Sequence, residues 1–211
     1  MSDLFPIFPT PILRAKQVLG GAQAASLSAR LIAAAATPNK RSGELLHTQI
    51  LSPKDDPELA AVALAITPHL EQFGALLFGE RLRWRIKEIW GNVLQPGGRQ
   101  SVHNHANSFI SGVLYLTESD PSAQTVFIRS LGGHDYVFSN VNARTELGPF
   151  NADKWIAPAP EPGDLVLFPS YLLHEVPPNR GALRVTLPFN AIPHRLESWG
   201  YGVSFGTDEV L

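Results

Sequence analysis

The first eighty residues carry apolar side chains at helical spacing. One such stretch is rich in alanine and runs from Gly21 to Pro38, where the proline is expected to end the helix. A second runs from Asp55 to Gly79, with an acidic start, Pro57 in the first turn and the glycine as a stop. The pattern therefore predicts two helices, which we expect to pack on the outside of a sheet.

From residue 81 onward the pattern changes to a period of two. Leu82, Trp84 and Ile86 alternate with three basic residues, which is typical of a half-exposed strand. Many short strands with little helix between them favour an antiparallel sandwich or barrel. The chain is long enough for one such domain, with a helical N-terminal third, 1–80, packed on a β region over 81–205. Further strands are predicted within residues 109–117, 123–130, 164–170, 172–176 and 182–190.

The composition narrows the chemistry that is open to the chain. A formal net charge of −2 provides no broad basic surface for nucleic acid. No apolar run reaches the roughly 18 residues of a membrane span, and the first residues do not resemble a signal peptide, so we expect a cytoplasmic protein. Because there are no cysteines, disulfides and thiolate metal sites are excluded, and His, Asp and Glu remain as the strong metal ligands.

Two histidines stand one residue apart just before the strand predicted within residues 109–117. If His103 and His105 lie on a strand, their side chains point to the same face and converge, as metal ligands do. Imidazole binds Fe, Zn, Cu and Ni alike. Isolated His-x-His pairs are also common at protein surfaces, so the pair by itself leaves both interpretations open.

A second candidate region lies in the last two predicted strands, which are separated by the turn-rich sequence PPNRG. If the chain folds back about Asn179, His174 lies opposite Arg184, about 5 Å away at Cβ and on the same face. Arg184 and Thr186 then share one face of their strand, while the apolar residues that alternate with them share the other. We interpret an arginine in such a strand as either exposed or buried against an anion.

The order of these features resembles the Fe(II)/2-oxoglutarate-dependent dioxygenases, and more narrowly a bacterial and phage group of 2-oxoglutarate/Fe(II) oxygenases. That group carries an H-x-H-x-x-S-x-x-S-G-x-x-Y-L strand, and later a G-D-x-x-x-F-P-S-x-x-x-H segment that continues to R-x-(S/T)-x-x-F-N. The opening LFPIFPTPI is similar to the group's usual start, so the resemblance covers essentially the whole chain. The matching residues are His103, His105, Ser108, Ser111, Gly112, Tyr115, Leu116, Gly163, Asp164, Phe168, Pro169, Ser170, His174, Arg184, Thr186, Phe189 and Asn190.

The resemblance implies a fold that is mainly β with flanking helices, namely a double-stranded β-helix or jelly roll of the cupin-like kind. It also implies an Fe(II) ion in the mouth of the roll and 2-oxoglutarate as co-substrate. Arg184 would bind the distal carboxylate of 2-oxoglutarate as a two-pronged salt bridge, a task that suits guanidinium. Thr186 would donate a hydroxyl to that carboxylate, and Tyr115 matches a tyrosine that helps to bind it in prolyl hydroxylases. The implied metal ligands are His103, His105 and His174.

The chain departs from the wider superfamily at one ligand. Most members have Asp or Glu where this chain has His105. Three neutral imidazoles leave a bound iron more positive than two imidazoles and a carboxylate. Either the centre has three histidine ligands, or His105 only lines the pocket and two histidines bind the iron. The nearby acids Glu118 and Asp120 follow the strand and offer little substitute.

Three functions remain open at this point. The first is an Fe(II)- and 2-oxoglutarate-dependent oxygenase that hydroxylates a small-molecule or peptide substrate with O2. The second is a cupin-like enzyme with a three-histidine metal and no 2-oxoglutarate, and the third is a non-catalytic jelly-roll binding module. Arg184 discriminates between the first two, because only the first requires it beside the third ligand. The long polar stretch 131–163 is expected to be functional, but it has no motif that names a substrate.

Overall fold

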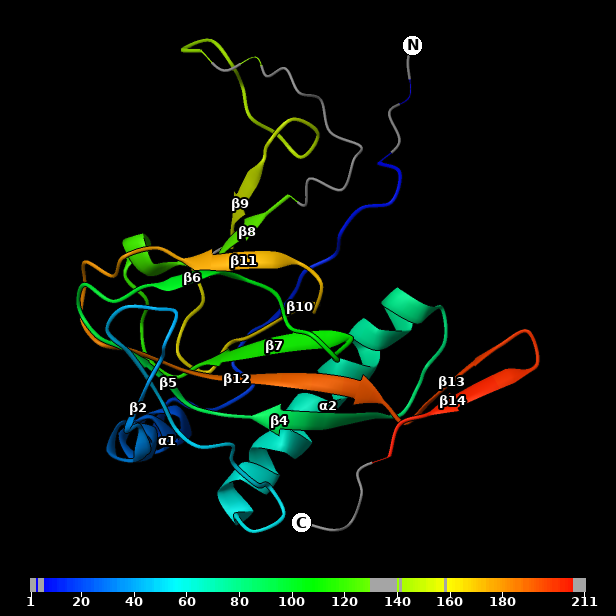
Figure 1. Ribbon diagram of the computed structural model, residues 1–211, viewed down its shortest axis with the longest axis horizontal. Helices are drawn as coiled ribbons and strands as arrows, with labels where there is room; N and C mark the ends of the chain where they lie inside the picture. Colours follow the sequence, from blue (N-terminus) through cyan, green and yellow to red (C-terminus); the bar gives the residue numbers. More distant parts are fainter. Residues whose placement is uncertain (1–2, 4–5, 130–139, 141, 158, 207–211) are drawn as a thin grey trace.

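The structure, a computed structural model, describes residues 3, 6–129, 140, 142–157 and 159–206. In this part of the chain two antiparallel sheets face each other (Figure 1). The larger, the major sheet, has the strand order β1-β10-β7-β12-β5-β3-β2, with β4 also paired to β12. The smaller, the minor sheet, has the order β6-β11-β8-β9. This is the mainly β jelly roll with flanking helices that the sequence predicted.

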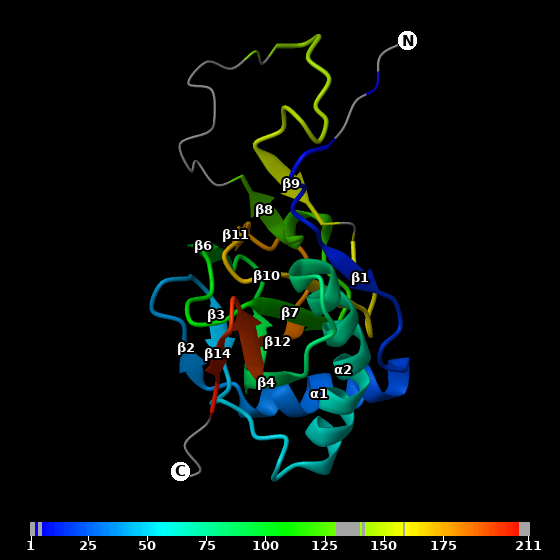
Figure 2. The same cartoon turned by 90° about the vertical axis from the view of Figure 1, so that its right-hand side faces the viewer.

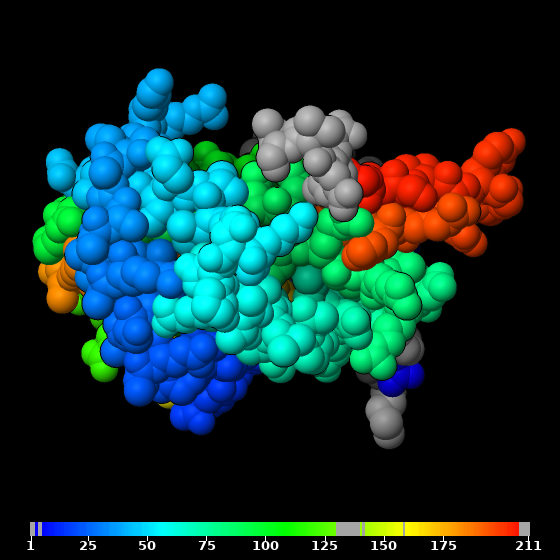
Figure 3. Space-filling model, turned by 90° about the horizontal axis from the view of Figure 1, so that it is seen from below, coloured from blue at the N-terminus to red at the C-terminus, as the bar shows by residue number. Residues whose placement is uncertain are grey.

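The strands are short, and most coincide with the predicted ones. The major sheet consists of β1 (Leu13–Ala15), β2 (Thr37–Pro38), β3 (Leu45–His47), β4 (Trp84–Ile89), β5 (Asn92–Leu94), β7 (Ile110–Tyr115), β10 (Leu165–Pro169) and β12 (Arg184–Pro193). The minor sheet consists of β6 (Gln100–His103), β8 (Val126–Ile128), β9 (Lys154–Ile156) and β11 (Leu173–Val176). A separate ribbon of β13 (Arg195–Ser198) and β14 (Tyr201–Ser204) projects from the body (Figure 3).

Two helices, α1 (Gly21–Ala34) and α2 (Pro57–Phe78), cover the outer face of the major sheet (Figure 2; Figure 3). The start of α2 follows from its sequence, since the Asp56 carboxylate accepts hydrogen bonds from the N–H groups of Glu58 and Leu59. The helix ends at Gly79, whose φ of 71° is left-handed. By length and composition α2 is apolar enough to cross a membrane. In this structure one face of α2 packs on the major sheet, and its buried side chains Leu59, Val62, Ile66, Leu70 and Phe73 belong to the core.

The central strand β12 separates the core from the site. Val185, Leu187 and Phe189 point into the core that lies between the major sheet and the helices. The alternate residues Arg184 and Thr186 point to the opposite side, where they line a cavity between the two sheets. The alternation that the sequence predicted for this strand is therefore confirmed.

The N-terminal third contributes more than helices, because β1, β2 and β3 add three short strands to the major sheet. The polar stretch 131–163 contributes β9, which pairs with β8. Residues 131–139 of that stretch, including His134, lie outside the described part of the chain. The short strands escaped prediction because two or three residues are too few to show a period.

The predicted hairpin between the last two strands is wrong. β11 pairs with β6 and β8 in the minor sheet, whereas β12 pairs with β4, β5 and β7 in the major sheet, so His174 and Arg184 are not cross-strand neighbours. The PPNRG segment carries the chain from one sheet to the other. Pro177 and Pro178 cannot donate to a strand ladder, and Asn179 instead exchanges main-chain hydrogen bonds with the 97–98 segment.

Candidate metal centre

Three imidazoles converge between the sheets. His103 at the end of β6 and His174 in β11 are direct cross-strand partners, with ring centroids 4.2 Å apart. His105 lies beyond the end of β6, on the connection to β7. Its main-chain N–H donates to the main-chain carbonyl of Ser170 at 3.0 Å. Each ring offers one nitrogen, and these atoms lie within 4.8 Å of one another. Among the described residues this is the cluster of His, Asp and Glu side chains that fits a metal ion.

His103 and His105 converge for a different reason from the one that the sequence predicted. The two histidines do not share one strand, because β6 ends at His103. Their rings still approach to 5.2 Å between centroids, because the main-chain bond to Ser170 turns the connection back over the cavity. The proximity that the spacing predicted is present, and the loop rather than strand alternation produces it.

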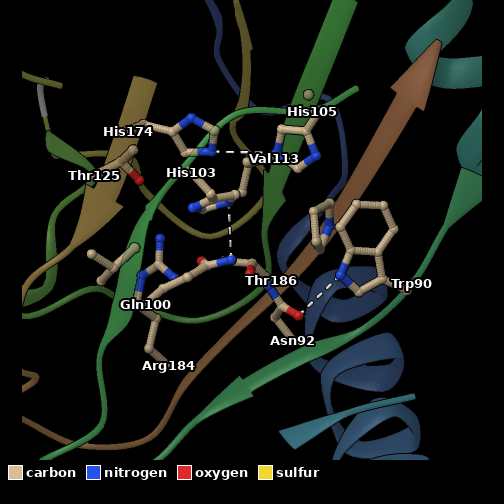
Figure 4. A pocket seen from close by; sticks show the side chains of 13 residues that line it. Trp90, Asn92, Gln100, His103, His105, Val113, Thr125, His174, Arg184 and Thr186 are labelled. Atoms are coloured by element: carbon tan, nitrogen blue, oxygen red, sulfur yellow. Dashed lines mark hydrogen bonds between the residues drawn. The ribbon is translucent and has the colours of Figure 1, made fainter. Parts of the chain in front are cut away.

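Two of the three rings are oriented by the main chain. The Nδ1–H of His103 donates to the Ser101 carbonyl at 2.7 Å, and that of His174 donates to the Leu172 carbonyl at 2.9 Å. In both cases the proton on Nδ1 leaves the lone pair on Nε2, which is the tautomer that a ligand needs. The Nε2 atoms of His105 and His174 lie 3.3 Å apart (Figure 4).

The surroundings keep these imidazoles neutral. Burial, with a smaller contribution from the neighbouring imidazoles, lowers the pKa of His174 to about 3 and that of His105 to about 4. Burial also lowers the pKa of His103. Neutral imidazole is the form that binds metal, so at neutral pH none of the three rings carries the second proton that would prevent binding.

Arg184 lies across the cavity from the imidazoles. Its side chain is 4% exposed, and its Nε donates to Ser119 Oγ at 3.1 Å. Its Cζ lies 5.1 Å from the centre of the Tyr115 ring. Within the described part of the chain Arg184 has no carboxylate partner, so its buried charge has no compensating anion. A cation in this position is suited to a carboxylate ligand.

The two hydroxyl residues predicted beside Arg184 differ in position. Thr186 lines the cavity, as expected. Tyr115 is 1% exposed and is not among the lining residues; its hydroxyl lies 3.0 Å from the Thr125 hydroxyl, and Thr125 does line the cavity. The tyrosine therefore lies behind the cavity wall, against the Arg184 guanidinium.

The cavity contains residues that sequence reasoning missed or weighed lightly. The space between its lining residues, including the part open to solvent, is about 360 Å³. The Nε2 of Gln100 lies 3.2 Å from Nε2 of His103, and the Asn92 amide oxygen accepts a hydrogen bond from the Trp90 indole (Figure 4). Behind the lining, Nδ1 of His47 lies 3.0 Å from the same Asn92 oxygen. Gln100 carries no sequence signal beyond its place three residues before His103.

The donor set fits Fe(II) together with a 2-oxo acid. Three neutral imidazoles on one side of a cavity bind a first-row divalent metal and leave other coordination positions open. The buried Arg184, without an ion-pair partner among the described residues, fits the far carboxylate of a dicarboxylic acid in the same cavity. These are the two groups that the site has to hold.

Comparison with known proteins agrees with this chemistry. The model of the family described as "Putative 2OG-Fe(II) oxygenase" matches residues 88–190, which contain all the residues of the site described above except His47. No curated protein matches the chain by sequence.

Solved structures share the fold at low sequence identity. HygX from Streptomyces hygroscopicus, solved with nickel and 2-oxoglutarate, is 15% identical with a TM-score of 0.61, over 87% of this chain and 83% of that one. The α-ketoglutarate-dependent epimerase SnoN from nogalamycin biosynthesis is 12% identical with a TM-score of 0.63, over 88% and 80%. A Pseudomonas putida prolyl-4-hydroxylase is 20% identical with a TM-score of 0.52, over 86% and 92%.

Proposed function

Because the chain belongs to the Fe(II)/2-oxoglutarate-dependent oxygenases, we propose that it hydroxylates a small organic substrate while 2-oxoglutarate is converted to succinate. The observation that carries the proposal is Arg184, a buried cation that has no ion-pair partner in the described chain and lines the same cavity as the three imidazoles. A cupin-like enzyme that uses the metal alone would have no need of this charge. A binding module would have no need of the convergent imidazoles.

In this proposal His103, His105 and His174 hold the iron. Their burial keeps them neutral, and the carbonyls of residues 101 and 172 fix two of the rings so that Nε2 faces the cavity. The metal, when bound with 2-oxoglutarate and O2, supplies the oxidant as the 2-oxo acid loses CO2. The protein contributes fixed ligands and a cavity that limits access of water to them.

Arg184 binds the distal carboxylate of 2-oxoglutarate. Its bond to Ser119 Oγ and its position against the Tyr115 ring restrict the guanidinium, so little side-chain entropy is lost on binding. The Thr186 hydroxyl lies on the same face of β12 and donates a second contact. The Tyr115 hydroxyl is engaged by Thr125, so Tyr115 acts by supporting the arginine rather than by binding the carboxylate directly.

A small-molecule substrate is supported by two of the similar structures. HygX has been solved with hygromycin B, and SnoN with nogalamycin RO, in each case together with 2-oxoglutarate or α-ketoglutarate. SnoN is an epimerase and the Pseudomonas putida protein a prolyl hydroxylase, so proteins of this fold include both epimerases and hydroxylases. Hydroxylation and epimerisation are separated by mass, since only hydroxylation adds an oxygen atom, which ¹⁸O₂ labels.

The proposal is tested by co-substrate binding and turnover. Anaerobic protein loaded with Fe(II) is expected to give the weak visible band of a chelated 2-oxo acid when 2-oxoglutarate is added, and slow uncoupled succinate formation in air. Loss of one side of a buried ion pair costs about 2–5 kcal/mol, so Arg184→Ala should weaken 2-oxoglutarate binding at least tens of fold. Arg184→Lys should restore part of it, since ammonium lacks the planar fork.

The matched control is Arg180→Ala, which removes an exposed arginine from the segment just before β12. It should leave 2-oxoglutarate affinity unchanged. Equal affinity in wild type and Arg184→Ala would contradict the proposal and favour the metal enzyme without 2-oxoglutarate.

A further inference from the structure

The third imidazole is held differently from the other two. His103 and His174 each donate from Nδ1 to a main-chain carbonyl, whereas the Nδ1 of His105 lies 3.2 Å from the side-chain amide nitrogen of Asn190. A carbonyl only accepts, and an amide nitrogen only donates. Nδ1 therefore faces a hydrogen-bond acceptor in His103 and His174, but a hydrogen-bond donor in His105.

The orientation of the Asn190 amide is fixed by its other partners. Its nitrogen also donates to Glu88 Oε1 at 2.7 Å, and its oxygen accepts from Ser111 Oγ at 2.7 Å. The Ser111 hydroxyl in turn lies 2.9 Å from the hydroxyl of Ser170. The main-chain carbonyl of Ser170 accepts a hydrogen bond from the main-chain N–H of His105. Asn190 is 2% exposed, so water does not replace these partners. An ionised carboxylate has no hydrogen to give, so the amide nitrogen has to face Glu88.

A bulge in β4 brings Glu88 to this position. Asn190 is paired with Glu88 in the register of β12 and β4, but the next pair is Ala191 with Ile86, so Lys87 is left without a partner. Directly opposite residues of an antiparallel pair lie on the same face, so Glu88 shares the cavity side of the sheet with Asn190. The Lys87 ammonium lies 3.6 Å from the Glu88 carboxylate, which is 30% exposed.

These contacts determine where the proton of His105 resides. With Asn190 donating to Nδ1, the neutral ring carries its hydrogen on Nε2. That hydrogen has an acceptor, because Nε2 of His174 is 3.3 Å away and His174 already uses its own proton at the Leu172 carbonyl. The chain Glu88–Asn190–His105–His174 is then satisfied at every atom, but His105 presents N–H rather than a lone pair to the centre.

We propose that Asn190, oriented by Glu88, is a positioning residue that holds His105 with its proton on Nε2 in the metal-free protein, and that metal loading turns the Asn190 amide over. On loading, the proton leaves Nε2 and another is taken up at Nδ1, so the ring stays neutral. The Asn190 oxygen then accepts from Nδ1–H, and Glu88 loses its hydrogen bond and turns to solvent. The second half of this inference rests on the proposed metal site; the first half does not.

The first half is tested in metal-free protein labelled with ¹⁵N at histidine. Long-range ¹H–¹⁵N correlation spectra report which ring nitrogen carries the proton. Rings of His103 and His174 are expected to be protonated on Nδ1 and that of His105 on Nε2, with signals assigned from single-histidine variants. A His105 ring protonated on Nδ1 in the wild type would overturn the inference, whatever the chain proves to catalyse.

The second half is tested with Glu88→Gln against Glu175→Gln as a matched control. Glu175 stands next to His174, pairs with exposed Lys154 at 3.1 Å and is 24% exposed, so both variants remove one carboxylate charge near the centre. Glutamine at 88 can donate to a turned Asn190 oxygen, whereas glutamate cannot.

We expect Glu88→Gln to bind Ni(II), measured by calorimetry, on the order of tenfold tighter than Glu175→Gln, since one charge-assisted hydrogen bond no longer has to break. In the metal-free spectra its His105 signals should shift toward the Nδ1–H form, while those of Glu175→Gln stay as in wild type. Equal affinity in the two variants together with an unchanged His105 tautomer would show that Glu88 does not govern this ring.

Discussion

The two sheets of the roll build the site in different ways. The major sheet is backed by α1 and α2 and by the larger hydrophobic core, and it presents Arg184, Thr186 and Asn190 from a single ten-residue strand. The minor sheet consists of short strands, and its outer face is exposed at Val102 and Ile156. It nevertheless supplies His103 and His174, and the connection between the sheets supplies His105.

This difference indicates that the two sheets contribute different parts of the site. Arg184, the proposed carboxylate ligand, lies on the sheet that is backed by the helices and the larger core, where its position is set without help from a ligand. The imidazoles lie on the minor sheet and its connection to β7, where hydrogen bonds to main-chain carbonyls orient two of the rings. We therefore expect variants of the minor sheet to act mainly on the metal, and variants of the major sheet to act mainly on the co-substrate and on stability.

The largest effect should come from His174→Ala in the minor sheet. It removes the most buried of the three imidazoles, and we expect the variant to lose stoichiometric Fe(II), measured by metal analysis after anaerobic loading and desalting. His69→Ala, on α2, is the control and should bind iron like the wild type. Stoichiometric iron in a His103→Ala/His174→Ala double variant would show that the metal binds elsewhere.

A lower pH should destabilise the metal-free protein through the same imidazoles. The folded pKa values of His174 and His105, about 3 and about 4, lie below the ordinary 6.5, so the unfolded chain takes up protons first as the pH falls. The loss begins near pH 6.5 and is complete only below the folded values. At pH 5 it amounts to about 2 kcal/mol per imidazole, measured by urea unfolding with a chelator at pH 7.5 and 5. In a His105→Ala/His174→Ala double variant this loss should disappear, and an equal loss in that variant would place its origin outside the centre.

The ion pairs of the two sheets should differ in strength. Asp164, at 1% exposure, accepts two hydrogen bonds from Arg14 and one each from the N–H groups of Gln17 and Glu161, and so holds β1 against β10. Asp164→Asn should cost about 3 kcal/mol of unfolding free energy, because it leaves a charge without its partner. Glu175→Gln breaks the exposed pair with Lys154 and should cost under about 1 kcal/mol. Similar costs in urea titrations would remove the distinction between the sheets.

A smaller change in metal binding than that of His174→Ala is expected at His105, which belongs to neither sheet. If it is a ligand, His105→Ala should weaken Fe(II) binding by about 10–100-fold, because one of three protein ligands is lost while the two held by the main chain remain. His105→Asp supplies the carboxylate that most relatives use, and should keep iron bound with altered turnover. Affinity of the alanine variant close to the wild type, measured by anaerobic titration, would reduce the centre to two histidines.

The sequence predicted the parts of the fold that have long or clear periods. The start and end of α2, the strand β7 and the two faces of β12 follow from local patterns that tertiary contacts reinforce. The residues of the centre could likewise be identified from the sequence, because His103, His174 and Arg184 belong to a motif with two separated parts. The residue types alone indicate metal and carboxylate binding, whereas the position at which these side chains come together depends on the fold.

The remaining features depend on long-range pairing, which periodicity does not encode. The alternation in LLHEV and ALRVTL is equally compatible with one hairpin and with two facing sheets, and the main-chain bonds of Asn179 decide between them. The contact between Glu88 and Asn190 requires a one-residue bulge, which shifts the register without altering the pattern of apolar residues. No sequence signal links residues 102 positions apart in this way.

The hydrogen bonds from His103 and His174 to main-chain carbonyls affect which positions near the centre tolerate substitution. A carbonyl oxygen is present whatever side chain stands at positions 101 and 172, so substitutions there leave the ring orientation untouched as long as the strands persist. The orientation of His105 depends instead on particular side chains at 88, 111 and 190. If all three histidines bind the metal as proposed, three positions around His105 can be varied to adjust its reactivity, while His103 and His174 keep a fixed orientation.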